Sequence, residues 1–242
     1  MNYYKMIQVD KLQKKYKEKV ALDIADVTIK KQEIIGLVGN NGAGKTTFLS
    51  LVLDLIQPTE GGVFLKDKNV AVHEDWKQYI GSFLDDTFLI PFMTSYEYLE
   101  FISKLHGWKK GDLEEFLEEN KQFYGDDFLS GKKMIKDLSK GNKNKTGILG
   151  AMIGSLDLLI LDEPFANLDP TSQQWLRIKI QKLAEQGVTV IVSSHDLQHV
   201  TGISSRIIML EEGVIIKDVA NTENTLAELE RYFGAKIQEQ TN

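Results

Sequence analysis

The sequence contains no cysteine and only 4 prolines among its 242 residues. The missing cysteine excludes a disulfide framework, a thiolate metal site and thiol catalysis, and it favours a reducing compartment. We also find no internal repeat and no Pro- or Ser-rich linker, so nothing in the sequence marks a spacer between separate domains.

Long hydrophobic runs are missing as well. No stretch approaches the roughly 18 uninterrupted apolar residues of a membrane span, since even the segment 147–161 carries Asp157 in its middle. Residues 1–19 hold no apolar stretch suited to a secretory signal. Any function at a membrane would therefore require another chain to supply the spans.

Positive charge is in deficit, with 29 Lys and Arg against 35 Asp and Glu, which gives a formal net charge of −6. This balance argues against a nucleic-acid partner, because affinity for the phosphate backbone comes from a clustered cationic surface. The 42% of hydrophobic residues is typical of a soluble globular protein with a buried core. The length suits one ample domain or two small ones.

Short apolar runs alternate with helical segments along the chain. The runs 33–38, 158–161 and 188–192 have the continuous apolar pattern of strands that are covered on both faces in a parallel sheet. Segment 46–56 is mostly apolar and long enough for a helix, and it predicts a buried helix that stops at Gln57 and Pro58. Strands that alternate with helices predict an α/β core with a mainly parallel sheet.

Other regions flank this core. Residues 20–29 alternate apolar and polar side chains, which predicts strands of an N-terminal antiparallel sheet, and 206–217 predict a hairpin. Between them a helical insertion is expected, with a helix over 143–155 and a helical stripe made of Tyr98, Phe101, Ile102 and Leu105. We predict one domain, with core segments 1–86 and 156–218, a helical part over 87–155 and a C-terminal tail over 219–242.

The segment 39–46 reads Gly-Asn-Asn-Gly-Ala-Gly-Lys-Thr and fits the pattern G-x-x-x-x-G-K-[ST], between a buried strand and a helix. Its glycines let successive backbone N–H groups turn toward phosphate oxygens, and the helix N-terminus adds partial positive charge. Lys45 would reach the β- and γ-phosphates, and the Thr46 hydroxyl would bind Mg²⁺. The alternative is a Gly-rich turn without a ligand.

Two carboxylates, Asp162 and Glu163, end the apolar run 158–161. Open α/β sheets bind ligands beyond the carboxyl ends of their strands, so Asp162 can reach a metal ion. Glu163 is placed to orient or deprotonate a water that attacks the γ-phosphate. The alternative is a strand-to-turn cap with two solvated acids.

Residues 138–142, Leu-Ser-Lys-Gly-Asn, then resemble the signature LSGGQ of the ATP-binding subunits of ABC (ATP-binding cassette) transporters, which generic P-loop proteins lack. Taken alone, this segment could be a helix N-cap. The resemblance extends over about residues 6–218. It implies an α/β P-loop NTPase core with a mainly parallel sheet, an N-terminal antiparallel β subdomain and an inserted α-helical subdomain.

Three further marks agree with this family in order and spacing. Residues 166–169 resemble its D-loop, His195 its switch histidine, and Tyr16 the aromatic residue that stacks on adenine. The resemblance implies ATP and Mg²⁺ as cofactors, with catalytic roles for Glu163, His195 and Lys45. It implies metal contacts for Thr46, Asp85 and Asp162. The expected nucleotide-binding residues are Tyr16, Gly39, Asn40, Asn41, Gly42, Ala43, Gly44, Lys45, Thr46, Thr47, Ser139, Lys140, Gly141 and Asp169.

The sequence departs from the family pattern at a few positions. Asp85 stands where the family has the Q-loop glutamine, and its side chain is shorter and acidic. In the signature, Lys140 replaces a glycine and Asn142 replaces the glutamine, and a lysine there resembles a subset of drug and peptide exporters. Ser139 and Gly141, which the family uses against the γ-phosphate, are kept.

The resemblance also implies partners. Two ATP-binding subunits, identical or closely related, would pair head to tail around two ATP and drive an integral-membrane permease subunit on a separate chain. Exposed aromatic residues Phe88, Phe92 and Tyr96 would form the docking groove, at the cytoplasmic face of the membrane. The alternatives are a soluble ABC-type ATPase and a nucleotide-dependent regulator. For the tail, the spacing of Leu226, Leu229, Tyr232 and Phe233 favours packing on its own domain over contact with a partner.

Overall fold

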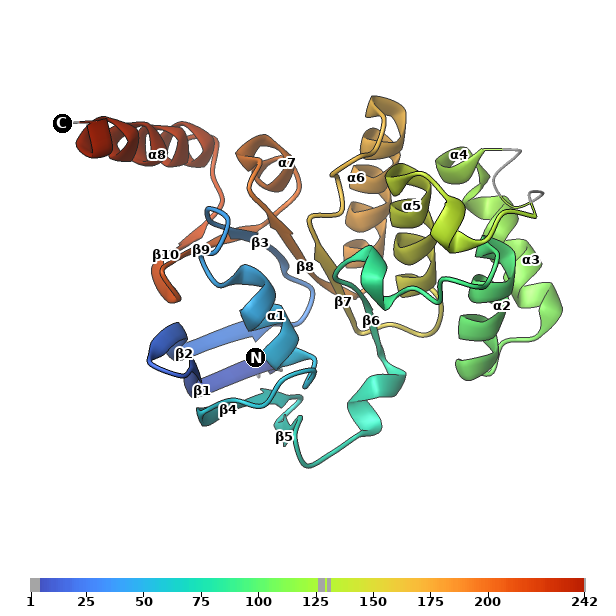
Figure 1. Ribbon diagram of the computed structural model, residues 1–242, viewed down its shortest axis with the longest axis horizontal. Coiled ribbons are helices and arrows are strands. Elements are labelled where there is room, and N and C mark those ends of the chain that lie inside the picture. Colours follow the sequence, from blue (N-terminus) through green and yellow to red (C-terminus); the bar gives the residue numbers. More distant parts are fainter. Residues whose placement is uncertain (1–4, 126–128, 130–131, 242) are drawn as a thin grey trace.

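The computed structural model describes residues 5–125, 129 and 132–241, and in these residues the strands form two β-sheets (Figure 1). The larger sheet has six strands in the order β10-β9-β3-β8-β7-β6. Five of them are parallel, and β10 is antiparallel to β9. The strands of this sheet are β3 (Ile34–Val38), β6 (Ile80–Phe83), β7 (Leu158–Asp162), β8 (Thr189–Ser194), β9 (Arg206–Glu211) and β10 (Val214–Ala220).

Every residue of β3, β7 and β8 is buried. This confirms the strands predicted from continuous apolar runs, because a parallel sheet is covered on both faces. The smaller, antiparallel sheet has the order β2-β1-β4-β5. Its strands are β1 (Lys5–Tyr16), β2 (Lys19–Lys30), β4 (Glu60–Leu65) and β5 (Lys68–Asn69). The expected fold class, an α/β core beside an antiparallel β part, is confirmed.

The two faces of the larger sheet belong to two hydrophobic cores. Leu37 of β3 lies in a core with the smaller sheet and with Phe48 and Leu49 of α1 (Lys45–Val52), so α1 packs between the two sheets. Its neighbour Val38 lies in the other core, with the remaining helices. Successive side chains of β3 thus point into the two cores, one on each face of the larger sheet.

The helix α1 is shorter than its apolar sequence predicted, because it ends at Val52 and not near residue 56. Asp54 adopts a left-handed backbone conformation with φ 51°. The N–H of Asp54 donates to Leu51 O (3.2 Å) and that of Leu55 donates to Ser50 O (2.9 Å), which is the hydrogen-bond pattern of a Schellman motif. The end of the helix therefore depends on one residue in a conformation that hydropathy does not reveal.

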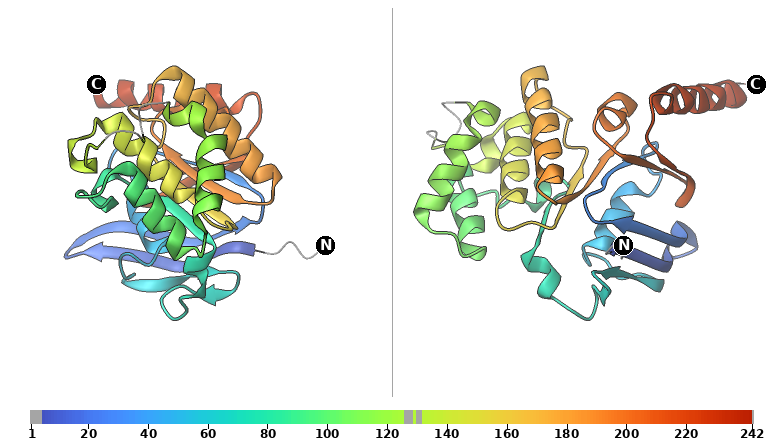
Figure 2. Two further views of the ribbon diagram at one scale, coloured as in Figure 1. Left: turned by 90° about the vertical axis from the view of Figure 1, so that its right-hand side faces the viewer. Right: turned by 180° about the vertical axis from the view of Figure 1, so that it is seen from behind.

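Helices follow β6 and precede β7, and Figures 1 and 2 show them gathered at one end of the molecule. They are α2 (Ser95–Leu105), α3 (Lys110–Glu119), α4 (Lys121–Tyr124) and α5 (Lys140–Ala151). The predicted helix 143–155 begins and ends earlier than expected. Its start is fixed by Ser139, whose hydroxyl accepts a hydrogen bond from the N–H of Asn142 (3.2 Å).

The buried face of α2 agrees with the predicted stripe only in part, since Tyr98 and Ile102 pack against the core. Phe101 and Leu105 are exposed, whereas Leu99 is fully buried. Ser95 and Ser103, one turn to either side of Leu99, are buried too, and the Ser95 hydroxyl hydrogen-bonds to Thr146 of α5 (2.8 Å). The face that contacts α5 therefore contains small polar residues, and a search for apolar stripes does not detect such residues.

The remaining helices are α6 (Pro170–Glu185), α7 (Leu197–Thr201) and α8 (Thr225–Thr241). In the views of Figures 1 and 2, α8 lies beside α7, at the end of the molecule opposite α2 to α4. Leu229 of α8 is fully buried, and Tyr232 and Phe233 pack against the same core. The tail thus packs on its own domain. None of the helices within residues 5–125 and 132–241 combines the length and hydropathy that a membrane span requires.

At one point the backbones of α5 and of β6 in the larger sheet lie very close together. A Cβ atom added to Gly81 of β6 would lie 1.8 Å from the backbone oxygen of Ala151, at the end of α5. No rotation of a side chain can relieve such a contact, because the backbone fixes the position of the Cβ atom and the oxygen belongs to the backbone of Ala151.

We therefore expect Gly81→Ala to lower the free energy of unfolding by about 1–3 kcal/mol, the usual cost of overpacking. Chemical denaturation of the purified protein measures this. Gly62→Ala in β4 is the matched control, because the nearest atom to its added Cβ is 3.5 Å away. Equal stability of the two variants would contradict the close approach of β6 and α5.

Candidate active site

Residues 39–44 form the loop between β3 and α1, at the carboxyl end of the parallel sheet. Gly44 has φ 106°, a left-handed conformation that favours glycine. A Cβ on Gly39 would lie 2.3 Å from the backbone oxygen of Leu210. The N-cap residue of α1 is Gly44, so no side chain caps the helix, and its first N–H groups are left to a ligand.

Lys45 is buried at the start of α1. Its Nζ donates hydrogen bonds to the backbone oxygens of Gly39 (2.6 Å) and Asn40 (3.4 Å), and it lies 3.7 Å from Glu163 Oε1. The ammonium group is thus held inside the curve of the loop, where it can meet the oxygens of a bound phosphate.

Thr46 and Asp162 come together at the base of the loop. The Thr46 hydroxyl donates to Asp162 Oδ2 (2.5 Å), and the Ser193 hydroxyl donates to Asp162 Oδ1. Burial raises the pKa of the Asp162 carboxyl, while the hydrogen bonds from Ser193 and Thr46 lower it. A carboxylate and a hydroxyl side by side are the oxygen ligands that suit Mg²⁺.

Glu163 follows directly and adopts a strained backbone conformation, with φ 48°. Its N–H donates to the backbone oxygen (3.1 Å) and the hydroxyl (3.1 Å) of Ser193. The Ser194 hydroxyl donates to Glu163 Oε2 (3.1 Å), and His195 Nδ1 lies 2.9 Å from the same oxygen. The carboxylate therefore lies between Lys45 on one side and His195 on the other.

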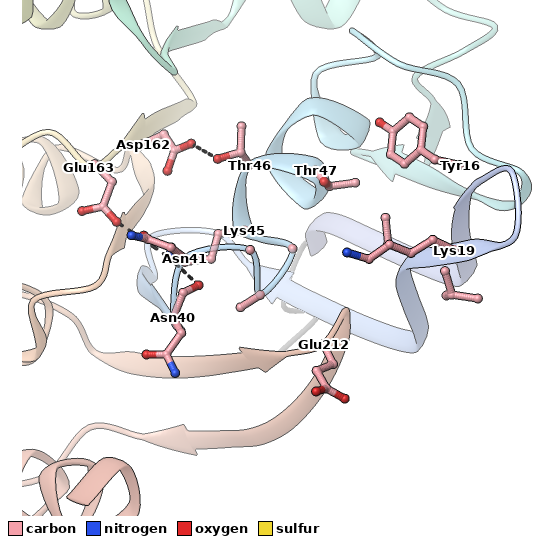
Figure 3. A pocket seen from close by; sticks show the side chains of 15 residues that line it. Tyr16, Lys19, Asn40, Asn41, Lys45, Thr46, Thr47, Asp162, Glu163 and Glu212 are labelled. Carbon is pink, nitrogen blue, oxygen red and sulfur yellow. Dashed lines mark hydrogen bonds and ion pairs between the residues drawn. The ribbon is translucent and has the colours of Figure 1, made fainter. Parts of the chain in front are cut away.

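A cleft of about 650 Å³ opens above the loop (Figure 3). Tyr16, at the end of β1, lies on its wall, with its ring half-exposed and the Lys14 Nζ 4.9 Å from the ring centre. The chain thus brings the predicted adenine-stacking residue to the same cleft as the predicted phosphate-binding loop. The cleft is lined by Tyr16, Lys19, Val20, Ala21, Asn40, Asn41, Gly42, Ala43, Gly44, Lys45, Thr46, Thr47, Asp162, Glu163 and Glu212.

Asp85, predicted as a metal ligand, turns its carboxylate toward its own loop. Asp85 Oδ1 accepts hydrogen bonds from the N–H (2.6 Å) and the hydroxyl (2.5 Å) of Thr87. The residue lines a smaller cavity of about 190 Å³, which Asp162 and Glu163 also reach. No cluster of three or more His, Asp or Glu residues with metal-binding geometry occurs among the described residues. A role for Asp85 at the metal stays a prediction.

The signature residues do not line the large cleft. Ser139 and Lys140 are exposed at the start of α5. Gly141 packs against the loop after β7, where a Cβ on it would lie 2.6 Å from the backbone oxygen of Asn167. Asn144 of the same helix donates to the backbone oxygen of Ala166 (2.7 Å). The signature turn is thus fixed to the predicted D-loop of its own chain, and Lys140 lines the smaller cavity with Asp162 and Glu163, outside the cleft of the phosphate-binding loop.

Asp169, predicted to contact the nucleotide, caps α6. Its Oδ1 accepts from the N–H of Ser172 (2.9 Å), its Oδ2 accepts from the Ser172 hydroxyl (2.6 Å), and Lys145 Nζ lies 3.3 Å from Oδ2. The hydrogen bonds from Ser172 hold the pKa of Asp169 well below its usual range. The structure does not bring Asp169 to the cleft that its own chain forms.

Comparison with known proteins identifies the family. The family described as ABC transporter matches residues 22–166, which include the loop and both strand-end carboxylates. The chain belongs to the ABC transporter family. It is 32% identical over 232 residues to the uncharacterised ABC transporter ATP-binding protein YhaQ of Bacillus subtilis (strain 168), covering 96% of this chain and 75% of YhaQ. It is 33% identical over 225 residues to the bacitracin transport ATP-binding protein BcrA of Enterococcus faecalis, covering 90% of this chain and 70% of BcrA.

Solved structures agree with this ABC assignment at the level of the fold. The dimeric structure of a post-hydrolysis state of the ATP-binding cassette MJ0796, bound to ADP and Pi, has a TM-score of 0.80 to this chain at 24% identity. It covers 90% of this chain and 99% of that one. As an ATP-binding protein of the ABC transporter family, the chain is an ATPase whose hydrolysis of ATP is coupled to transport.

Some residues of this ABC site were not predicted from the sequence. Ser193 and Ser194 fix Asp162 and Glu163 in place, and Lys19 and Glu212 line the cleft. The two serines directly precede His195 at the carboxyl end of β8, so their position in the sequence was a usable signal. For Glu212 there was none, because its place follows from how the β9–β10 turn meets the loop.

Proposed function

We propose that this ATPase forms a head-to-tail pair with a second ATP-binding subunit, identical or closely related, and that the pair drives export through a membrane-spanning subunit on a separate chain. The observation that carries the pairing is the position of Ser139 and Gly141. Gly141 packs against the loop after β7, and neither residue lines the cleft that Lys45 and Glu163 line. A second copy, turned head to tail, would complete each cleft with its signature turn.

Hydrolysis within the completed cleft follows from the side chains around Glu163. Thr46 and Asp162 would hold Mg²⁺, which neutralises charge on the phosphates when it is bound. Glu163 aligns the attacking water or accepts its proton, since its carboxylate is anchored by Ser194 and borders the cleft. Lys45 and His195, on the two sides of that carboxylate, stabilise the charge that develops on the transferred phosphoryl group.

The membrane partner would dock near the start of the helical region. Phe88 and Phe92 are 56% and 71% exposed, and Met134, which pairs with Thr94 beside them, is exposed as well. Tyr96, predicted to join them, is instead partly buried against the core. Exposed aromatic side chains grouped in this way are typical of an interaction surface. This surface would place the protein at the cytoplasmic face of the membrane.

One observation supports export: Lys140 stands in the signature where some drug and peptide exporters have a lysine. The relative BcrA is named for the transport of bacitracin, and we extend a cargo of that kind to this chain as part of the proposal.

The first of three predictions from the proposed function concerns the pair. Glu163→Gln should lower kcat by a factor of about 100 or more, because it removes the water-aligning carboxylate. With hydrolysis blocked, sedimentation in the presence of MgATP should show a shift from monomer to dimer. Ser139→Arg, added to the same chain, should reverse the shift. A monomer with and without MgATP, despite measurable ATP binding, would contradict a pair of identical subunits.

A second prediction tests the metal site. Ser193→Ala removes the hydrogen bond that orients Asp162, so the Mg²⁺ concentration for half-maximal ATP hydrolysis should rise about 10-fold. Ser194→Ala is the matched control, because Ser194 bonds to Glu163, and it should lower kcat with the Mg²⁺ requirement unchanged. The same Mg²⁺ requirement in both variants would argue against Asp162 as the ligand.

A third prediction tests docking. Phe92→Glu should reduce the fraction of the protein that sediments with membranes of the source organism about 10-fold, as for a residue central to an interface. Val72→Glu is the control, because Val72 is 72% exposed, nearly the same as Phe92, but lies in the turn after β5. If the unaltered protein hydrolyses ATP and never sediments with membranes, the soluble ATPase is the better description.

A further inference from the structure

The turn between β9 and β10 lies directly against the phosphate-binding loop. Its two residues, Glu212 and Gly213, have φ 47° and 83°, as a two-residue type I′ hairpin requires. The N–H of Gly213 donates to the backbone oxygen of Ala43 (3.0 Å), and its own oxygen accepts from the N–H of Asp23 (2.8 Å). The turn thus lies between the loop and β2 and is hydrogen-bonded to both.

The loop has little freedom to move independently of this hairpin. A Cβ on Gly39 would lie 2.3 Å from the oxygen of Leu210, and a Cβ on Gly44 would lie 3.4 Å from the Cα of Gly213. The first and last glycines of the loop therefore both touch the end of the hairpin. A shift of the turn would change the positions of the N–H groups that the loop offers to phosphates.

The helix α8 holds the same hairpin from the other side, next to β9 and β10 in Figure 1. Glu211, the last residue of β9, accepts a hydrogen bond from the Tyr232 hydroxyl (2.8 Å) and forms an ion pair with Lys236. The carboxylate of Glu211 is three-quarters buried in this pair, with 24% of its side chain exposed. The Lys236 ammonium lowers the pKa of Glu211, which keeps the carboxylate ionised.

The contacts of α8 also reach the neighbourhood of the catalytic residues. Phe233 and Lys236 line a second cleft of about 470 Å³ together with His195 and with Asn40 and Asn41 of the loop. One helix at the end of the chain therefore borders the loop and the predicted switch histidine, and contacts the turn that supports the loop.

We propose that α8 is a positioning element for ATP binding: Tyr232 and Lys236 hold Glu211, Glu211 fixes the β9–β10 turn, and the turn fixes the phosphate-binding loop in the shape that receives phosphates. The proposal rests on ATP binding at this loop, and it adds a control point that touches no nucleotide. Anything that detaches α8 lets the loop shift and so lowers the affinity for ATP, although no residue that contacts ATP is itself changed.

The test compares two lysines that anchor α8. Lys236 bonds to Glu211, next to the hairpin turn, whereas Lys217 of β10 forms an ion pair with Glu228 of α8 (2.8 Å) away from the turn. Lys236→Met should raise the KM for ATP about three- to tenfold, the effect of one hydrogen bond, with kcat changed less than about twofold. Lys217→Met should leave both constants unchanged, although it removes an ion pair from the same helix.

Tyr232→Phe provides a milder second variant, which keeps the ring against the core and should raise the KM for ATP about twofold to fivefold. Hydrogen exchange without nucleotide gives a readout apart from turnover. In Lys236→Met, and not in Lys217→Met, exchange should accelerate at the N–H of Gly213 and at the amides of the loop.

The outcomes separate this proposal from the function it rests on. Equal KM values and equal exchange in the two lysine variants, with normal turnover in the unaltered protein, would overturn the role of α8 alone. Failure of the unaltered protein to bind ATP would overturn both the role of α8 and the function itself.

Discussion

The buried carboxylate of Asp162 joins three elements that lie far apart in the sequence. It ends β7, it accepts a hydrogen bond from Ser193 of β8, and it accepts another from Thr46 at the start of α1. Burial makes an isolated carboxylate costly, so the protein supplies hydroxyl donors on both of its oxygens. Because these donors come from β8 and α1, the arrangement of sheet, loop and helix is fixed at the base of the candidate active site.

The parallel sheet explains why those groups meet at all. Asp162 is paired with Ser193, and Ser194 with Val38, so β3, β7 and β8 end at the same edge. The loop after β3 and the acids after β7 therefore line one cleft, and the histidine after β8 contacts Glu163 from the neighbouring cleft, although 157 positions separate Val38 from His195. The β1–β2 hairpin then brings Tyr16 to that cleft from the smaller sheet.

How much of this the sequence could predict depends on how local each signal was. The loop 39–46 has a fixed spacing of glycines after an apolar strand, and the pair Asp162–Glu163 directly follows another apolar strand. Both line the same cleft, as the sequence predicted. The fold class followed from the alternation of strands and helices. The predicted end of α1 was wrong because Asp54 takes a left-handed conformation, and the predicted buried face of α2 was only half right because part of that face holds serines. Neither feature has a signature in hydropathy.

Contacts between distant segments were the hardest to foresee. Nothing in the residues 206–217 shows that their turn would support the loop, since that depends on how β9 pairs with β3. For the same reason the orientation of Asp85 and the capping role of Asp169 could not be read from the family pattern, which gives positions and not hydrogen bonds.

The backbone of Glu163 has a consequence for the evolution of the protein. A left-handed conformation costs a residue with a side chain about 1–2 kcal/mol, and glycine would adopt it freely. A chain with glycine at this position would thus gain backbone stability and lose the carboxylate to which we assign the alignment of the attacking water. Stability and activity are in direct conflict at this residue, so a search for more heat-resistant variants that ignored turnover would tend to select inactive proteins.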